Sequence, residues 1–177
     1  MTRRPAHGDA ADYYFRYIDL VPEGDVVALL DDQRAEVRAL FGAIPPAAAD
    51  TRHAPGAWSL RELAGHLADT ERVFLARVHW FARGFDAPLP SFNQHIAVMH
   101  AGSDAVAWTA LVDDLLAARV STVSFLRLLP DEAWERGGVA SGNHVTVRAL
   151  AYLAAGHVAH HLHLARERYS HVMELPR

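Results

Sequence analysis

Two histidines near the C-terminus, His157 and His161, have the residue type and spacing that can bind a metal ion. At about 100° of rotation per residue, side chains four positions apart on a helix lie about 40° apart on one face. Leu150 and Leu164 lie within about 20° of His157 on the same helical projection, so the pair falls in the middle of an apolar stripe. Two imidazoles at this spacing can share one metal ion. Burying them without partners would cost on the order of a few kcal/mol, and the spacing alone leaves metal binding and a structural role equally open.

A metal site of the catalytic zinc type needs a third protein ligand beside this pair. His66 lies in a second helical pattern, about 100° from the centre of its apolar stripe, where it can face a neighbouring helix. Periodicity therefore permits His66 but does not select it over the other candidates. Those candidates are the carboxylates and His79, His95, His100 and His144. His160 lies about 60° from His157, and its role stays open.

The composition limits which other chemistry this chain can perform. Its 177 residues include 12 His but no Cys and no Lys, so all 17 basic side chains are Arg. Without Cys there are no disulfides, thiolate nucleophiles or iron–sulfur clusters. Without Lys there is no Schiff-base chemistry and no phosphate-loop lysine. The chain itself offers no thiol or amine nucleophile, so one of these would have to be brought by a cofactor, and the side chains left for chemistry are His, Asp, Glu, Arg, Tyr and Ser.

Charge and hydropathy argue against two classes of partner. The net charge is −4 with neutral His, and no basic stripe is present, which disfavours nucleic-acid binding. No apolar run reaches the roughly 18–20 residues that a membrane span needs, and the N-terminus lacks a signal-type apolar core. We expect no nucleic-acid or membrane partner, and a cytoplasmic protein.

Hydrophobic periodicity predicts four long helices that would position the histidines, with no convincing strand. Ser59 and Glu62 form a capping-box pattern at the start of the second helix, and Thr146 is the expected entry to the fourth. A long crossing loop with one short helical turn at 94–100 separates the second and third helices. We therefore expect an all-α four-helix bundle. The predicted ranges are an N-terminal arm at 1–23, a single bundle domain at 24–173, helices at 24–43, 59–84, 103–129 and 146–171, and the loop at 86–102.

Four segments in register resemble the DinB-like superfamily of four-helix bundle proteins, close to the branch described as YfiT-like metal-dependent hydrolases. They are YIDLVPEGDVVALLDDQ, HAPGAWSLRELAGHLADTERVF, LPSFNQH and GGVASGNHVTVRALAYLAAGHVAHHLHLARERY, and together they span about residues 13 to 170. The resemblance implies a divalent metal held by His66, His157 and His161. It also implies a homodimer and, by analogy with the characterised chemistry of such proteins, use of a low-molecular-weight thiol.

Several residues near these motifs are candidates for further roles. Asp69 follows His66 by one turn and is either a support for that ligand or a solvated carboxylate. Arg77 and Arg119 can each meet an anionic substrate or pair with a carboxylate. The crossing loop departs from the family pattern, because His95 stands where an acidic residue is expected. This departure implies an altered substrate, a non-catalytic role, or a direct role of His95 as a ligand or base.

Two functions follow as hypotheses. The first is a metal-dependent enzyme in which a thiol or water, activated by zinc, nickel, manganese or iron, attacks a small electrophilic substrate, as in thiol S-transfer or hydrolysis. The second is a non-catalytic dimeric module of the stress-response or ligand-binding kind, with a closed metal site. A pocket that reaches the histidines would favour the enzyme.

Overall fold

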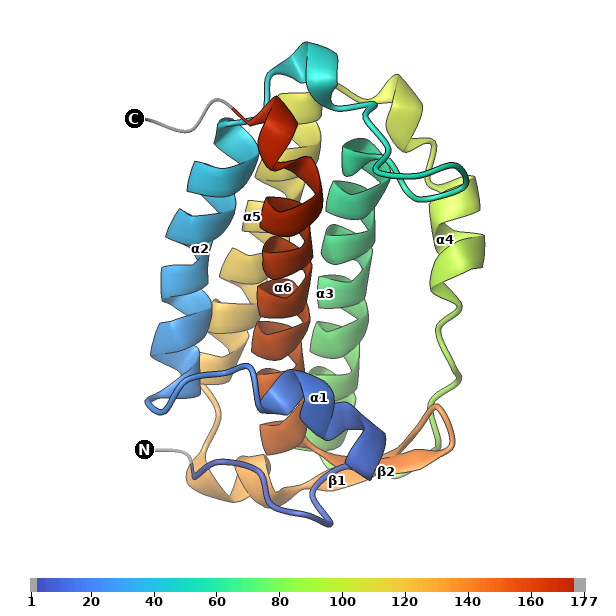
Figure 1. Ribbon diagram of the computed structural model, residues 1–177. Helices are drawn as coiled ribbons and strands as arrows, with labels where there is room; N and C mark the ends of the chain where they lie inside the picture. The colour runs from blue at the N-terminus through green and yellow to red at the C-terminus, as the bar shows by residue number, and fades with distance from the viewer. Residues whose placement is uncertain (1–2, 174–177) are drawn as a thin grey trace.

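Four long helices build the body of the protein in this computed structural model, which describes residues 3–173 (Figure 1). They are α2 (Val26–Gly42), α3 (Leu60–Ala82), α5 (Trp108–Arg127) and α6 (Val147–Tyr169). Two short helices are added: α1 (Phe15–Ile18) packs against α6, and α4 (Gln94–His100) lies beside α3. The predicted four-helix bundle is confirmed, as is the helical turn in the crossing loop. Met1 and Thr2, the first residues of the predicted arm, lie outside the described residues.

The helix starts are set by side chains that accept hydrogen bonds from the first free backbone N–H groups. The Ser59 Oγ accepts from the Glu62 N–H at 3.2 Å, while the Glu62 carboxylate accepts from the Ser59 N–H at 2.7 Å. Thr146 caps α6 by accepting from the Ala149 N–H at 3.1 Å. The capping box and the Thr146 start predicted from the sequence are therefore both present. Each cap fixes where along its helix a histidine further on will lie.

The expected start of the third long helix at 103 is wrong. Residues Ser103–Ala105 form a separate 3-10 turn, and α5 begins at Trp108. Val106 and Ala107 both have extended ψ angles near 140°, which interrupts the helical backbone between the 3-10 turn and α5. Ser103 is buried with its Oγ close to Gly65 of α3, so the turn is held against that helix.

The expectation of no strand is also wrong, because residues 137–146 form a small antiparallel hairpin. Strands β1 (Gly137–Ala140) and β2 (Asn143–Thr146) pair with Ala140 opposite Asn143. The two-residue turn, Ser141 and Gly142, has φ angles of +55° and +76°, as a type I′ turn requires. The sequence gives no sign of these strands, because four-residue strands are too short to show a period-2 pattern.

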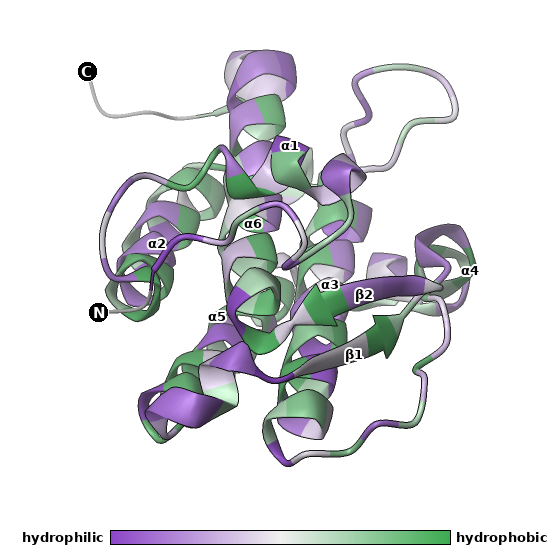
Figure 2. Cartoon of the chain, turned by 90° about the horizontal axis from the view of Figure 1, so that it is seen from below, coloured by the Kyte–Doolittle hydropathy of each residue, from purple (hydrophilic) through white to green (hydrophobic). Residues whose placement is uncertain are grey.

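The hairpin and the N-terminal segment lie over the end of the bundle seen from below in Figure 2. The N–H of Thr146 donates to the Asp9 carbonyl at 2.8 Å, which joins the segment to β2. Arg4 donates to the carbonyls of Ile18 and Val21 at 2.7 and 2.8 Å. Gly156 of α6 lets the backbone of α1 come close, since a Cβ there would lie 2.0 Å from the Tyr17 carbonyl oxygen.

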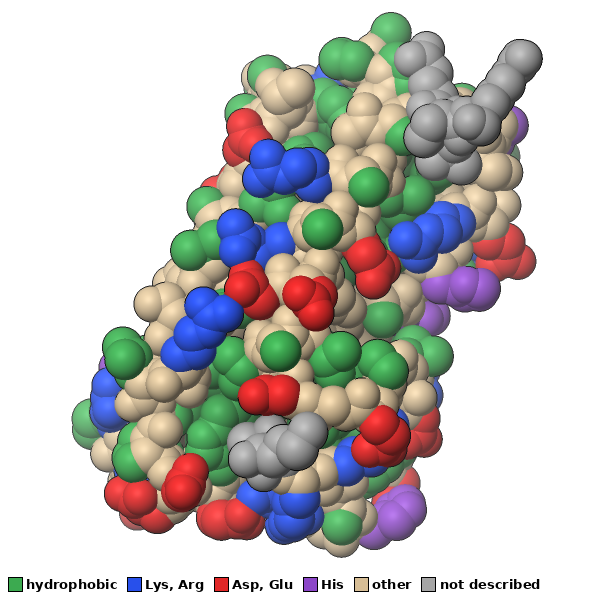
Figure 3. Space-filling model, turned by 90° about the vertical axis from the view of Figure 1, so that its left-hand side faces the viewer, with side chains coloured by type: hydrophobic (Ala, Val, Ile, Leu, Met, Phe, Trp, Pro, Cys, Tyr) green, Lys and Arg blue, Asp and Glu red, His purple; other side chains and the backbone are tan. Residues whose placement is uncertain are grey.

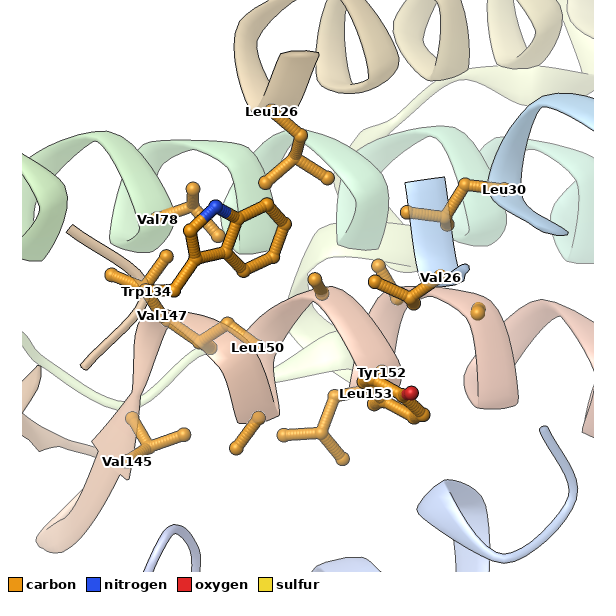
Figure 4. Close-up of a cluster of buried hydrophobic side chains, with 14 of the residues drawn as sticks. Val26, Leu30, Val78, Leu126, Trp134, Val145, Val147, Leu150, Tyr152 and Leu153 are labelled. Atoms are coloured by element: carbon orange, nitrogen blue, oxygen red, sulfur yellow. The ribbon is translucent and has the colours of Figure 1, made fainter. Parts of the chain in front are cut away.

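The buried apolar side chains form two clusters, one towards each end of the bundle. The cluster at the hairpin end includes Trp134 and Leu150 (Figure 4), and the other includes Phe41, Trp108 and Leu162. On the outer face shown in Figure 3, basic and acidic side chains are interspersed. Among residues 3–173, no helix combines the length and the apolar character needed to span a bilayer.

Candidate metal centre

Three histidines from two helices converge in the bundle. His66 comes from α3, and His157 and His161 come from successive turns of α6. One nitrogen of each imidazole lies within 4.8 Å of the other two, and the Nε2 atoms of His66 and His157 are 3.2 Å apart. His66 and His157 are buried at 2% and 8% exposure, while His161 is partly exposed. The structure thus brings together the three residues that the sequence pointed to as a metal-binding group.

Burial keeps these imidazoles uncharged at neutral pH. Desolvation, with a smaller electrostatic effect of His95, lowers the pKa of His66 to about 4. Desolvation, followed by electrostatic interaction with His66, His160 and Arg168, lowers the pKa of His161 to about 3. The pKa of His157 is also lowered well below the usual value, chiefly by burial. Neutral imidazole is the form that binds a metal ion, so little proton release would accompany binding at pH 7.

The donor atoms fit a divalent metal ion. Two nitrogens bound tetrahedrally at about 2.1 Å from zinc would lie about 3.4 Å apart, close to the 3.2 Å between His66 and His157. Thr70 Oγ1 lies 3.3 Å from the His66 Nδ1 and can accept a hydrogen bond from an Nδ1–H group, which leaves the Nε2 lone pair facing His157. Two lone pairs at such a distance repel unless a proton or a cation lies between them. The three histidines could therefore hold a metal ion.

A buried ion pair lies beside the histidines and separates the two apolar clusters. Arg119 of α5 donates to both carboxylate oxygens of Glu71 on α3, at 2.8 and 2.9 Å, and both side chains are almost fully buried. The Arg119 guanidinium also donates to the Gln33 side chain at 2.7 Å and to the Ala154 carbonyl at 3.2 Å. Gln33 in turn donates to the Ala155 carbonyl at 2.9 Å. The network thus holds the backbone of α6 just before His157.

A pocket of about 340 Å³ opens onto the candidate metal centre at His161. Trp58 forms part of its wall and also stands against His66, with the ring centroids 4.8 Å apart. The lining is apolar along Leu63, Leu164 and Ala165, and within the part of the chain that the structure describes it contains no Asp or Glu. A small organic molecule could therefore reach the one histidine of the three that is partly exposed.

Comparison with known proteins agrees with this architecture. The sequence profile described as the DinB superfamily matches residues 29–165, more than three quarters of the chain. The chain belongs to the DinB superfamily. A comparison with curated proteins finds no match.

Solved structures with the DinB fold cover most of this chain at low sequence identity. YfiT from Bacillus subtilis, described as "a probable metal-dependent hydrolase with an unusual four-helix bundle topology", superposes with a TM-score of 0.70 at 17% identity over 93% of each chain. A mycothiol-dependent maleylpyruvate isomerase superposes with a TM-score of 0.66 at 15% identity, over 90% of this chain and 66% of the isomerase. These likenesses show the fold.

The structure separates the remaining candidates of this DinB chain into those at the pocket and those elsewhere. His95, at the start of α4, lines the pocket, and its ring centroid is 5.5 Å from that of Trp58. Asp69 lies 3.9 Å from Arg72 and is affected by the charge of Asp114 on α5, so it belongs to a surface charge cluster. Burial raises the pKa of Asp69.

Two further candidates, Arg77 and His160, do not line the pocket. Arg77 donates to the Ser141 hydroxyl at 2.9 Å and to the Pro90 carbonyl at 3.2 Å, which ties α3 to the hairpin and the crossing loop. His160 packs edge-on against Tyr17 of α1, with the ring centroids 5.4 Å apart. Of the two roles expected for Arg119, contact with an anionic substrate or pairing with a carboxylate, the structure shows pairing with a carboxylate.

Sequence reasoning missed Glu71 and Gln33. Glu71 lies four residues after Leu67 and seven before Val78, so it falls on the apolar stripe of α3. A charged residue on such a stripe indicates a buried partner, and Arg119 stands four residues after Leu115 on the stripe of α5. Reading the two exceptions together would have predicted the ion pair.

Proposed function

We propose that this protein is a metal-dependent enzyme in which a low-molecular-weight thiol or water attacks a small electrophilic substrate, as in thiol S-transfer or hydrolysis. His66, His157 and His161 would hold the divalent ion, whether zinc, nickel, manganese or iron. When bound, the ion would lower the pKa of a thiol or water in its open position and so supply the nucleophile at neutral pH. The observation that carries the proposal is the pocket that ends at His161.

The lining of the pocket favours the thiol over water as the nucleophile. A thiol with an ordinary pKa near 8.5 ionises readily, whereas hydrolysis usually employs a general base beside the metal ion. Among the described residues no Asp or Glu lines the pocket, and His95 is the side chain there that is best placed to take up a proton. Trp58 and Leu164 supply an apolar surface for the substrate at the wall of the pocket.

The test is a turnover assay on purified, metal-free protein with zinc, nickel or manganese added back. A panel of thiols is mixed with a small electrophile such as 1-chloro-2,4-dinitrobenzene, and formation of the thioether is followed by absorbance. We expect a rate that requires protein, metal and thiol together, that disappears in His161→Ala and that persists in His163→Ala, which alters an exposed histidine of the same helix. A rate no higher than that of the metal-free control with every thiol and metal contradicts thiol transfer.

The non-catalytic module remains the second candidate, because the pocket lacks the acidic residue that the family pattern places in the crossing loop. Tight metal binding without turnover of any thiol or ester substrate would support it. The homodimer implied by the resemblance and a cytoplasmic location are further proposals. Light scattering coupled to gel filtration tests the homodimer.

A further inference from the structure

The pocket has a second polar end, opposite the candidate metal centre. Arg168 follows His161 by seven residues, two turns of α6, so it lies on the same face about 10.5 Å further along the helix axis. Leu164 and Ala165 line the pocket between them. Side chains on a helix lean towards its N-terminus, which directs Arg168 back over the pocket. The pocket is therefore apolar in the middle and basic at its outer end.

Most of the polar atoms at this end are already paired with one another. The Tyr169 hydroxyl donates to the Trp58 carbonyl at 2.9 Å and lies 3.0 Å from the His53 Nδ1. If the hydroxyl accepts from that nitrogen, the other nitrogen of His53 is an acceptor, and Arg168 Nη1 lies 3.4 Å from it. Among residues 3–173, the chain of hydrogen bonds uses one donor of Arg168, and the rest of its guanidinium fork has no partner there.

The charge of Arg168 is not balanced within the described residues. None of the carboxylates in residues 3–173 lies within 4 Å of its guanidinium, and no Asp or Glu among these residues lines the pocket. Nearby basic residues differ in this respect: Arg52 pairs with Glu62, and Arg166 pairs with Glu36 at 3.4 Å. A cation at the rim of an apolar pocket attracts an anion, and a guanidinium can hold a carboxylate through two parallel hydrogen bonds.

We propose that Arg168 binds the carboxylate of an elongated organic ligand whose apolar part lies along Leu164 and Trp58. If the proposed function holds, on which this assignment of the substrate class rests, the other end of the ligand reaches His161. The carboxylate belongs either to the electrophilic substrate or to the thiol. Arg168 is a specificity residue in this account, because it selects charged ligands over neutral ones of the same shape.

The experiment measures binding by calorimetry with two matched pairs of probes on the zinc-loaded protein. One pair is 4-phenylbutyrate and its uncharged amide; the other is 6-mercaptohexanoate and 6-mercaptohexanol. Each is titrated into the unaltered protein, Arg168→Gln, Arg168→Lys and the control Arg166→Gln. A charge-assisted hydrogen bond contributes about 1.5–3 kcal/mol, so at least one carboxylate should bind about tenfold or more tightly than its neutral partner.

The quantity that decides is the ratio of the two affinities within a pair. Arg168→Gln should abolish the preference for the carboxylate, Arg168→Lys should restore part of it, and Arg166→Gln should leave it unchanged. A loss of fold around His53 and Trp58 would weaken both members of a pair equally and leave their ratio unaltered. The pair that responds identifies the source of the carboxylate.

No preference in either pair, or an equal preference in Arg168→Gln, overturns the proposal. Repeating the titration of 4-phenylbutyrate on metal-free protein separates this failure from failure of the proposed function. If the metal-free protein binds 4-phenylbutyrate in a way that depends on Arg168, and the protein shows no metal-dependent turnover, the anion site is supported and the proposed enzymatic function is contradicted.

Discussion

Removing the positive charge of the buried ion pair should destabilise the whole bundle. In Arg119→Met the Glu71 carboxylate stays buried but loses the two hydrogen bonds of 2.8 and 2.9 Å that satisfy it. The side chains of Arg119 and Glu71 are only 4% and 1% exposed, so solvent cannot replace the lost partner. Breaking such a pair costs about 3–5 kcal/mol, which corresponds to a fall of roughly 6–20 °C in Tm for a chain of this size.

The same change should weaken metal binding, because Arg119 also donates to the Ala154 carbonyl, three residues before His157. Urea unfolding followed by circular dichroism at 222 nm measures the stability, and calorimetry with zinc measures the affinity. The double variant Arg119→Met with Glu71→Gln removes both charges and should regain at least half of the lost stability, since no uncompensated charge is left buried. A matched control is Arg72→Met, which breaks the exposed pair between Arg72 and Asp114 and should cost about 1 kcal/mol or less.

Two outcomes would refute this reasoning. If Arg119→Met costs less than about 1 kcal/mol, the pair does not hold the helices together. If the double variant is as unstable as the two single losses added together, the cost does not come from an uncompensated charge.

Three other predictions concern acid stability, the N-terminal segment and the crossing loop. Burial holds the pKa of His66 at about 4, against about 6.5 in the unfolded chain. Between these two pH values only the unfolded state takes up this proton, so the stability falls as the pH falls. For this residue alone the loss from pH 7 to pH 5 is about 2 kcal/mol, and equal urea midpoints of chelated protein at the two pH values would contradict it. Gly156→Ala places a Cβ 2.0 Å from the Tyr17 carbonyl oxygen of α1, so we expect a loss of about 1–3 kcal/mol in stability and faster proteolysis within residues 3–23. In the control Gly42→Ala the new Cβ meets no atom within 4 Å, and the stability should change by no more than about 1 kcal/mol. Similar cleavage rates in both variants would count against the close packing of α1. His95→Asn should retain the bound metal yet slow thiol transfer about tenfold or more, while His100→Asn, at the other end of α4, should change neither; an unchanged rate in His95→Asn would remove His95 from the chemistry.

The sequence was most informative where a periodic pattern ran over many turns. The stripes of α3 and α6 predicted both helices to within two residues, since an apolar face and a cap at its start together determine a helix. The pair His157 and His161 could be recognised because helical geometry alone places them on one face. Contact between His66 and this pair depends on how α3 packs against α6, and periodicity within one helix carries no information on that; the family resemblance supplied it.

The features that the sequence did not predict are either very short elements or contacts between residues far apart in the chain. The hairpin is four residues on each side of Ser141 and Gly142, too short for its alternation to stand out. Pairing of Arg119 with Glu71 joins residues 48 positions apart on different helices. Asp69 follows His66 by one turn of α3, but it lies in the surface charge cluster with Arg72 and Asp114.

The central claim, that His66, His157 and His161 hold one metal ion, is tested most directly by the metal content of single variants. Each protein is loaded with zinc, dialysed and analysed by mass spectrometry for metal per chain. We predict about one ion per chain in the unaltered protein and in the control His163→Ala, and a small fraction of that in His66→Ala, His157→Ala and His161→Ala, because two imidazoles alone bind weakly. Unchanged metal content in any of the three variants, with the fold intact by circular dichroism, would contradict the account.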